Sequence, residues 1–280
     1  MTNPLCISVP AALADRIEAD AVVIRSARCA EIVKAFRRRG ERIQGVLLES
    51  VDDDLINLAE LPVGMFMTVK MHPREAAQIY TSSWMSDRFN LGVLMDIDVG
   101  LLQGVRIVTS AGVSVMLNPD EVYDTGELLS VLHYYLHEPH LQVPVEFFHS
   151  LFNAYLNNTP VSLEEMYPES PDTFLYVDEL GRISGSARLA CAGEFFGEVR
   201  DSLTLDTTCN AYKSLLDRRK NIFLSGSACA SCEHFDVCGA YLRFVEKEFD
   251  CDPFKKTFEQ IKAKAREFAE DLSSSALSGE

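Results

Sequence analysis

Short apolar segments alternate with helical patterns through the first 165 residues, and this alternation sets the class of fold. Most of the segments are continuously apolar, which is typical of strands covered on both faces. They are Leu5 to Val9, Ala21 to Ile24, Val46 to Leu48, Met65 to Val69, Leu91 to Ile97 and Val105 to Val108. Their spacing is close to the length of one strand plus one helix. The pattern predicts an α/β fold with a parallel sheet, as a partial (β/α) barrel or an open sheet.

Helical periodicity fills the stretches between these strands. In residues 27–39, for example, Ile32, Val33 and Phe36 share one face of a helix. Further helices are expected over residues 52–58, 73–84, 126–137, up to about 156, and 254–272. Two more strands are expected, one in a hairpin over residues 112–117 and one over residues 143–148.

The composition changes between residues 157 and 172, which are rich in Asn, Pro, Ser and Glu. We interpret this stretch as the boundary between an α/β domain and a smaller cysteine-rich domain, followed by a disordered tail. The three parts span residues 1–165, 166–272 and 273–280. The second domain is expected to open with a hairpin, whose strands and turn span residues 173–177, 179–181 and 182–190.

The net charge is −16, from 26 Lys and Arg against 42 Asp and Glu. A field of that sign repels a phosphate backbone, so no nucleic acid partner is expected. Residues 1–10 lack a signal-peptide pattern, and no apolar run approaches the roughly 20 residues of a membrane span. We therefore expect a cytoplasmic protein without membrane contact, whose eight cysteines serve metal or redox chemistry rather than disulfides.

Four of these cysteines are clustered near the end of the chain. Cys229, Cys232 and Cys238 follow the pattern Cys-x2-Cys-x5-Cys, and Cys251 comes soon after them. Two cysteines separated by two residues can direct both sulfurs to one centre, and two more can complete its shell. Four thiolates suit a 4Fe-4S cluster or a tetrahedral Zn²⁺ ion, and the spacing alone does not separate the two.

The segment around these cysteines resembles a SPASM domain, the cluster-binding extension of many radical S-adenosylmethionine (radical SAM) enzymes that modify peptides. In that family the positions matched by Cys229, Cys232, Cys238 and Cys251 hold the outer auxiliary four-iron cluster. Residues 174–181 resemble the family's hairpin, and residues 196–199 resemble the aromatic-glycine step that follows it. The resemblance covers roughly residues 170–260 and implies one 4Fe-4S cluster on these four cysteines.

The chain also departs from the family at several positions. Leu242 replaces a further cysteine, and Gly185 and Ser186 stand where another is usual, so we expect the inner auxiliary cluster to be missing. Cys191 and Cys209 are off the usual spacing and are expected to be core residues. The front half lacks the Cys-x3-Cys-x2-Cys trio that generates radicals, and its isolated cysteines, Cys6 and Cys29, are expected in the apolar core.

Retention of the scaffold without the radical-generating trio is similar to accessory SPASM proteins of the GeoRSP type. The resemblance implies a non-catalytic partner, an electron relay or scaffold, for a radical SAM/SPASM enzyme that matures a peptide. A PqqD-like peptide carrier is a further expected partner. A zinc-stabilised scaffold or regulatory protein remains an alternative.

Charged residues at the predicted strand ends leave a third alternative, an enzyme with a site at the barrel rim. These residues are Arg25, Glu49, Lys70, His72, Asp96 and Asp98. Charged residues also collect at strand ends simply because these meet water, and we favour that interpretation. His133 and His137, with His140 nearby, are expected on an ordinary helix surface, whereas His234 could donate to a cluster sulfur or replace a zinc ligand.

Overall fold

The computed structural model describes residues 5–19, 21–50, 55–122, 124–245 and 247–277. Within these residues one sheet of eleven strands runs through the molecule, in the order β11-β10-β9-β8-β1-β2-β3-β4-β5-β6-β7. The strands are β1 Cys6–Pro10, β2 Ala21–Ser26, β3 Ile43–Leu48, β4 Phe66–Lys70, β5 Asn90–Ile97, β6 Ser114–Val122, β7 Val145–Glu146, β8 Phe174–Val177, β9 Arg182–Ser184, β10 Gly197–Val199 and β11 Leu203–Leu205.

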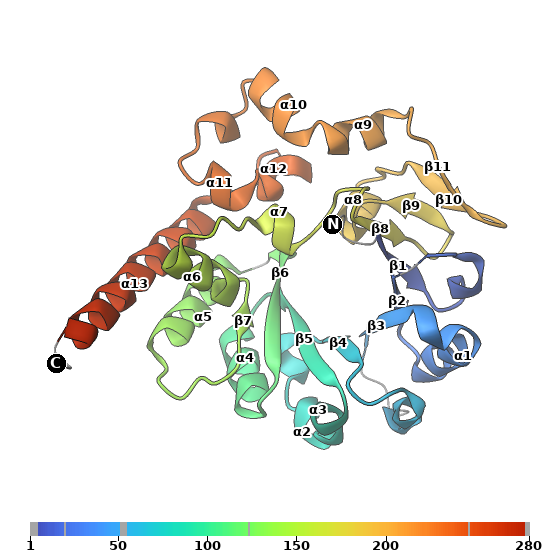
Figure 1. Ribbon diagram of the computed structural model, residues 1–280, viewed down its shortest axis with the longest axis horizontal. Coiled ribbons are helices and arrows are strands. Elements are labelled where there is room, and N and C mark those ends of the chain that lie inside the picture. Colours follow the sequence, from blue (N-terminus) through green and yellow to red (C-terminus); the bar gives the residue numbers. More distant parts are fainter. Residues whose placement is uncertain (1–4, 20, 51–54, 123, 246, 278–280) are drawn as a thin grey trace.

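Strands β1 to β7 are parallel and follow chain order, so each crossover places a helix or short turn outside the sheet. The longer crossover helices are α1 Cys29–Arg39, α4 Leu101–Ser110 and α5 Thr125–His137. Figure 1 shows these strands as a curved wall with the helices on its convex side. The strand side chains that face the helices are buried, whereas alternate residues of β4 and β5 on the other face are half-buried. This is a partial (β/α) barrel, as the sequence predicts.

The remaining helices are short, apart from the last. They are α2 Gln78–Thr81, α3 Trp84–Arg88, α6 Phe148–Asn157, α7 Leu163–Met166, α8 Ala187–Cys191, α9 Asn210–Leu216, α10 Arg218–Leu224, α11 Phe235–Cys238, α12 Tyr241–Val245 and α13 Asp252–Leu277. Figure 1 shows α9 to α12 across the side of the molecule opposite the curved wall. Helix α13 packs against α5 and α6, where Phe147 stacks on Phe254 and Phe152 meets Phe268.

Two strand predictions in the front half are wrong. Residues 105–108 lie within α4, because this helix presents Val105 and Val108 to the sheet and its apolar face resembles a short buried strand. The strand predicted over residues 112–117 is present from Ser114 onward as the start of β6, but its predicted hairpin is wrong. Strand β6 pairs parallel to β5, because α4 is a crossover helix and not a strand.

Several predicted elements differ in extent. Residues 73–84 divide into a 3-10 turn, α2 and the start of α3, and residues 55–60 form a 3-10 helix whose predicted start lies outside the described residues. The return strand ends at Ser184 and continues into α8, because Ser186 accepts the N–H of Leu189 as a helix cap. Helix α13 continues to Leu277, past the position where the sequence predicts a disordered tail.

The predicted boundary at residue 165 does not interrupt the sheet. Strand β8 pairs parallel to β1, with Phe174 opposite Cys6 and Tyr176 opposite Ser8. Strands β9, β10 and β11 then extend the sheet by antiparallel pairing. The cysteine-rich segment is therefore attached to the first strand of the wall by main-chain hydrogen bonds.

Candidate metal centre

The four clustered cysteines come from short, tightly turned elements between α10 and α13. Cys229 lies in a 3-10 turn, where its N–H donates to Ser227 Oγ over 3.3 Å, and the Cys232 N–H donates to the Cys229 carbonyl over 3.2 Å. Cys238 ends α11, and Gly239 follows with a φ of 63° that allows the chain to reverse. Cys251 directly precedes α13. Each of these cysteines is half-buried.

All four of these cysteines line one cavity of about 340 Å³. The other walls include Phe254 and Phe258 from the first turns of α13, which are buried, and the ring of His234. Four thiols around one enclosed space, with apolar side chains behind them, are the donor set that iron–sulfur clusters and zinc require. The residues present therefore fit a metal group at the place that the sequence predicts.

Burial controls the acidity of two of these thiols. It raises the pKa of Cys238 to about 11, although the N–H groups of Leu242 and Tyr241 act in the opposite direction. Burial also raises the pKa of Cys251, which the guanidinium of Arg243 partly offsets. Because a thiolate is the form that binds metal, the positive charge of a bound metal would stabilise it here. Arg243 would remain beside it as a cation.

His234 lies between this cavity and the surface. Its side chain is 12% exposed, and its Nε2 lies 3.5 Å from the carboxylate of Glu259 and 3.8 Å from that of Glu233. Neither contact is a hydrogen bond, since Nε2 is buried and makes none within the described part of the chain. The two carboxylates lie only at ion-pair distance. The ring contacts Phe258, with 5.8 Å between centroids. His234 therefore borders the cysteine cavity while its free nitrogen faces carboxylates.

A buried ionic network, which sequence reasoning missed, joins this region to the barrel. Glu169 is 1% exposed and accepts hydrogen bonds from Arg188, Arg218 and Ser186. Burial on its own would raise the pKa of Glu169, but the two arginines outweigh it and hold that pKa below its ordinary value. Arg188 also donates to the Tyr241 carbonyl over 2.8 Å. The network thus connects α8, α10 and α12 around one carboxylate.

The same network reaches the end of strand β6. Tyr241 donates its hydroxyl to Asp120 over 2.7 Å, and Nε of Arg188 lies 3.5 Å from the same carboxylate. Of the two positions where the SPASM resemblance implies cysteines, Ser186 donates to Glu169 in this network, whereas Leu242 is buried and lines the cysteine cavity. A set of ion pairs and apolar side chains occupies the surroundings of these two positions. The charged residues of this network are far apart in the sequence, and no motif there predicts that they meet.

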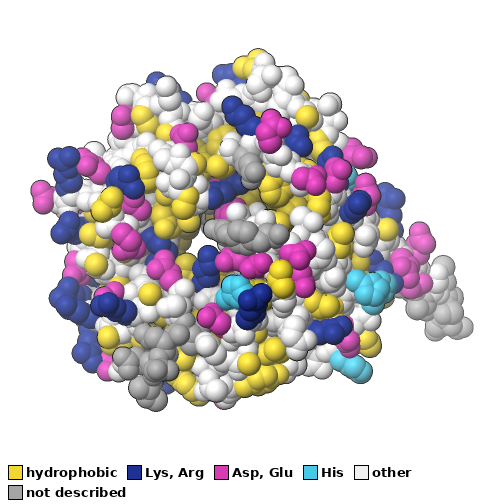
Figure 2. Space-filling model, turned by 180° about the vertical axis from the view of Figure 1, so that it is seen from behind, with side chains coloured by type: hydrophobic (Ala, Val, Ile, Leu, Met, Phe, Trp, Pro, Cys, Tyr) yellow, Lys and Arg dark blue, Asp and Glu magenta, His cyan; other side chains and the backbone are white. Residues whose placement is uncertain are grey.

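The predicted rim residues form ion pairs between neighbouring strands. Nη1 of Arg25 contacts Glu49 over 2.9 Å, Lys70 contacts Asp96 over 3.3 Å, and His72 contacts Asp98 over 3.2 Å. Glu49 and Asp96 therefore pair with different cations. The hydrogen bond from the Val99 N–H, and after it the contact with His72, lowers the pKa of Asp98. Figure 2 shows charged side chains of both signs around a central hollow on this face.

Arg25 has a further role at the rim. Its side chain is 3% exposed, donates to the Tyr176 hydroxyl over 2.9 Å and to the Val177 carbonyl, and lies over the Tyr176 ring. It therefore ties β2 and β3 to the hairpin of β8 and β9. This arrangement favours the structural interpretation of the rim over an enzyme site.

The other cysteines and histidines take ordinary positions. Cys29 is buried in the core as predicted, whereas Cys6 is half-buried and burial raises its pKa. Cys209 packs at the edge of the core and accepts the N–H of Tyr212 as the cap of α9. Cys191 is exposed, so the prediction of a core position is wrong for it, because α8 turns that side chain outward. His133 and His137 are exposed on α5, with ring centroids 4.5 Å apart.

Comparison with solved structures supports the class of fold. The chain is similar to a structure described as anSMEcpe with bound AdoMet, carrying a hexahistidine tag, with a TM-score of 0.59 and 12% sequence identity. The similarity covers 93% of this chain and 85% of the other. At this level of identity, the similarity shows that the two chains share a fold. No family model and no curated protein matches the chain.

The helices were also compared with the requirements of a membrane span. Among the described residues, none is both long enough and apolar enough to cross a bilayer.

Proposed function

We propose that this chain binds one 4Fe-4S cluster through Cys229, Cys232, Cys238 and Cys251 and acts as a partner of a radical SAM enzyme. In that role it serves as an electron relay or scaffold during peptide maturation. A cluster at this position supplies one-electron redox chemistry. The observation that carries the proposal is the shared cavity: four cysteines, drawn from separate short elements, enclose one space.

The spacing of the sulfurs favours a cluster over a single zinc ion. With a Zn–S distance of about 2.3 Å, tetrahedral thiolates lie about 3.8 Å apart. Within the described residues, one group brings three metal-binding atoms within 4.8 Å of one another, and it contains Glu233, His234 and Glu259 but no cysteine. No three of the four sulfurs therefore lie within 4.8 Å of one another, which supports the proposal of a cluster over a single zinc ion.

The absence of the radical-generating trio from the sequence supports a partner rather than a radical enzyme. Cys6 and Cys29 are the cysteines of the first 165 residues, and Cys29 is buried in the core. The structural neighbour is described with bound AdoMet. For this chain we propose the same scaffold without that chemistry, in a complex with a radical SAM/SPASM enzyme and a PqqD-like peptide carrier.

Anaerobic purification followed by metal and sulfide analysis tests the cluster. We expect about four irons and four sulfides per chain, with broad visible absorption that dithionite bleaches. One zinc per chain, without sulfide or visible absorption, would instead establish the zinc-stabilised alternative. A chain that holds neither metal after anaerobic reconstitution would exclude both.

Co-expression tests the partner. The chain and a radical SAM/SPASM enzyme encoded beside it are expected to co-purify. An electron relay further requires that the enzyme's turnover falls when Cys238→Ser removes the cluster, while the complex still forms. Turnover that is unchanged by this variant, with the complex intact, would leave the scaffold role and exclude the relay.

A further inference from the structure

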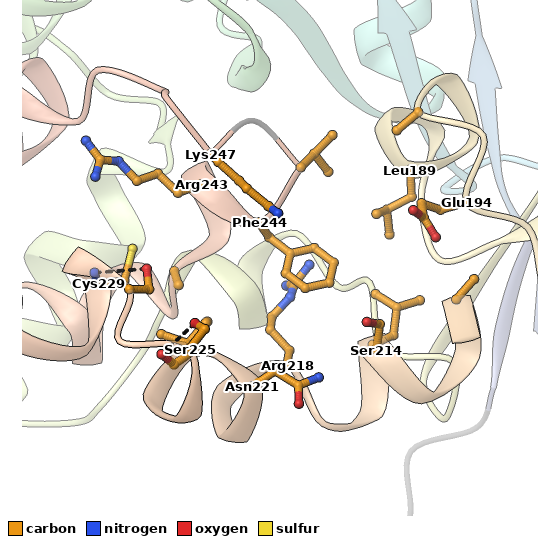
Figure 3. Close-up of a pocket in the computed structure, with 17 residues that line it drawn as sticks. Leu189, Glu194, Ser214, Arg218, Asn221, Ser225, Cys229, Arg243, Phe244 and Lys247 are labelled. Carbon is orange, nitrogen blue, oxygen red and sulfur yellow. Dashed lines mark hydrogen bonds between the residues drawn. The ribbon is translucent and has the colours of Figure 1, made fainter. Parts of the chain in front are cut away.

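A second cavity, of about 650 Å³, lies beside the cysteine cavity, and Cys229 is on the wall of both. Helices α9 and α10 form one side, α12 forms the opposite side, and α8 closes one end. Figure 3 shows Phe244 near the middle, with Arg218 beneath it and Glu194 and Leu189 at the far end. The volume is in the range of small-molecule and short-peptide sites.

Arg218 lines this cavity and carries one donor without a partner. Its side chain is 2% exposed, and its Nη2 donates to Glu169. Its Nε is buried and has no hydrogen-bond partner in the described part of the chain. A buried N–H without an acceptor costs about 1–3 kcal/mol, so this position favours an oxygen atom from a ligand.

The guanidinium of Arg218 is fixed in place before any ligand arrives. It lies 3.8 Å from the centroid of the Phe244 ring, and its other nitrogens are held by Glu169 and by Glu164, the latter at 3.8 Å. A fixed donor loses little entropy when it binds an oxygen. The guanidinium of Arg218 is therefore held in one orientation while its Nε–H has no partner.

The charges around the cavity favour an anion. Lys247 lines the wall beside Phe244, Arg243 lies at the end nearest Cys229, and Glu194 is the acidic member of the lining. In a chain with a net charge of −16, this is a local reversal of sign. Low-dielectric walls concentrate such a field on the space between them.

The rest of the lining is apolar or weakly polar. Leu189, Leu215 and Ile222 are buried and face the cavity together with Phe244, and Ser214 and Asn221 add neutral polar groups. An apolar surface with a few converging polar groups binds ligands that have one charged end and an apolar body. An acidic residue beside an apolar residue in a short peptide has this form.

We propose that this cavity is a binding site for a carboxylate-bearing ligand, with its oxygens toward Arg218 and Lys247 and its apolar part on Phe244. The ligand class is an acidic peptide segment or a small dicarboxylate, which share this chemistry. The site shares Cys229 and Arg243 with the cysteine cavity, but Arg218 and Lys247 line the larger cavity alone. The proposal therefore does not require a particular metal on the four cysteines.

Calorimetry on the full chain, purified anaerobically, tests the site with three probes. They are acetyl-Phe-Glu-amide, the neutral acetyl-Phe-Gln-amide and glutarate. We expect the Glu peptide to bind at least about tenfold more tightly than the Gln peptide, as for loss of a charge-assisted hydrogen bond. Binding of glutarate but not of the Glu peptide would assign the site to small dicarboxylates, and the reverse would assign it to peptides.

Three variants locate the binding. Ser214→Trp, at an exposed position of α9 on the cavity wall, is expected to block it, and Lys213→Trp on the same helix but off the wall is the matched control. Lys247→Gln is expected to weaken the Glu peptide about three- to tenfold without changing the Gln peptide. Arg218→Lys keeps the charge but removes Nε, and it is expected to weaken binding of both carboxylate probes.

The proposal is wrong if the Glu and Gln peptides bind equally, or if Ser214→Trp binds the Glu peptide as tightly as the unmodified chain. It is also wrong if none of the three probes binds at about 10 mM. Circular dichroism confirms that each variant is folded. Because Ser214 and Lys247 are exposed, these two variants decide the outcome even if Arg218→Lys does not fold.

Discussion

Arg188 and Glu169 form a two-point ion pair, in which Nε and Nη2 of Arg188 donate to the two carboxylate oxygens of Glu169 over 2.6 and 2.7 Å. Both side chains are largely or fully buried, at 11% and 1% exposed. The pair fastens α8 to the segment that leads into β8, and Arg218 brings α10 to the same carboxylate. One acidic residue therefore holds both α8 and α10 beside the segment that leads into β8.

Glu169→Gln tests that dependence. The variant removes the nearest counter-charge of two buried arginines, which keep only longer contacts to Asp120 and Glu164. We expect it to lower the free energy of unfolding by about 3–5 kcal/mol. Glu233→Gln is the control, because Glu233 is 82% exposed and its loss should cost less than about 0.5 kcal/mol. Urea denaturation followed by circular dichroism measures both. Equal stability of the two variants would contradict the role of Glu169.

The stability of the protein in acid follows from the same residue. Because the pKa of Glu169 is lowered in the folded state, its contribution is fully present above the ordinary glutamate pKa of about 4.3. It is lost as the pH falls through the lower, folded-state pKa. Denaturation at a series of pH values should therefore show a steeper loss of stability below about pH 4.3 in the unmodified chain than in Glu169→Gln. Parallel curves would refute this linkage.

Metal content should depend on the four clustered cysteines and on no others. Cys238→Ser removes a donor from the cavity wall, and we expect iron or zinc content to fall several-fold or to disappear. Cys191→Ser changes an exposed cysteine that does not line the cavity, and it should retain the full content. Elemental analysis of anaerobically purified variants measures the difference. Metal loss in both variants would argue against a site defined by this cavity.

The rim ion pairs should differ greatly in their effect on stability. Arg25→Met leaves the Glu49 carboxylate, the Tyr176 hydroxyl and a carbonyl without a donor, and we expect a cost of about 3 kcal/mol. Lys70→Met removes a pair whose lysine is 36% exposed, and it should cost less than about 1 kcal/mol. Thermal unfolding of the two variants tests this order. A reversed order would show that Arg25 is not the tie between β2 and the β8–β9 hairpin.

The sequence predicted the wall of the barrel because buried parallel strands leave a direct pattern. The apolar segments at the start of the chain correspond to β1 to β5, and α1 and α5 lie where the periodicity places them. The strand predicted over residues 105–108 is wrong, since a short apolar stretch is compatible with a buried helix as well as with a strand. The predicted hairpin at residues 112–117 followed from that error, because a strand over residues 105–108 would have needed a tight turn to reach β6.

The sequence singled out four cysteines that line one cavity, whereas the other walls of that cavity were not predictable, and metal binding by the cysteines stays a prediction. Cysteine spacing predicted that four sulfurs meet, and the structure lines one cavity with them. Arg243, by contrast, is near Cys251 only because α12 folds back after Gly239, and no spacing rule encodes such a fold-back. The pairing of Glu169 with Arg188 and Arg218 spans 19 and 49 residues, so it depends on tertiary structure alone.

The place of β1 inside the sheet has a consequence for synthesis on the ribosome. This strand ends at Pro10, yet its second neighbour, β8, is complete only at Val177. At about 5–20 residues per second, the nascent chain keeps one edge of β1 unpaired for roughly 8 to 33 s. An open, apolar strand edge invites pairing with other chains, so slowed translation before residue 177 should increase aggregation, and a chaperone that covers β1 should relieve it.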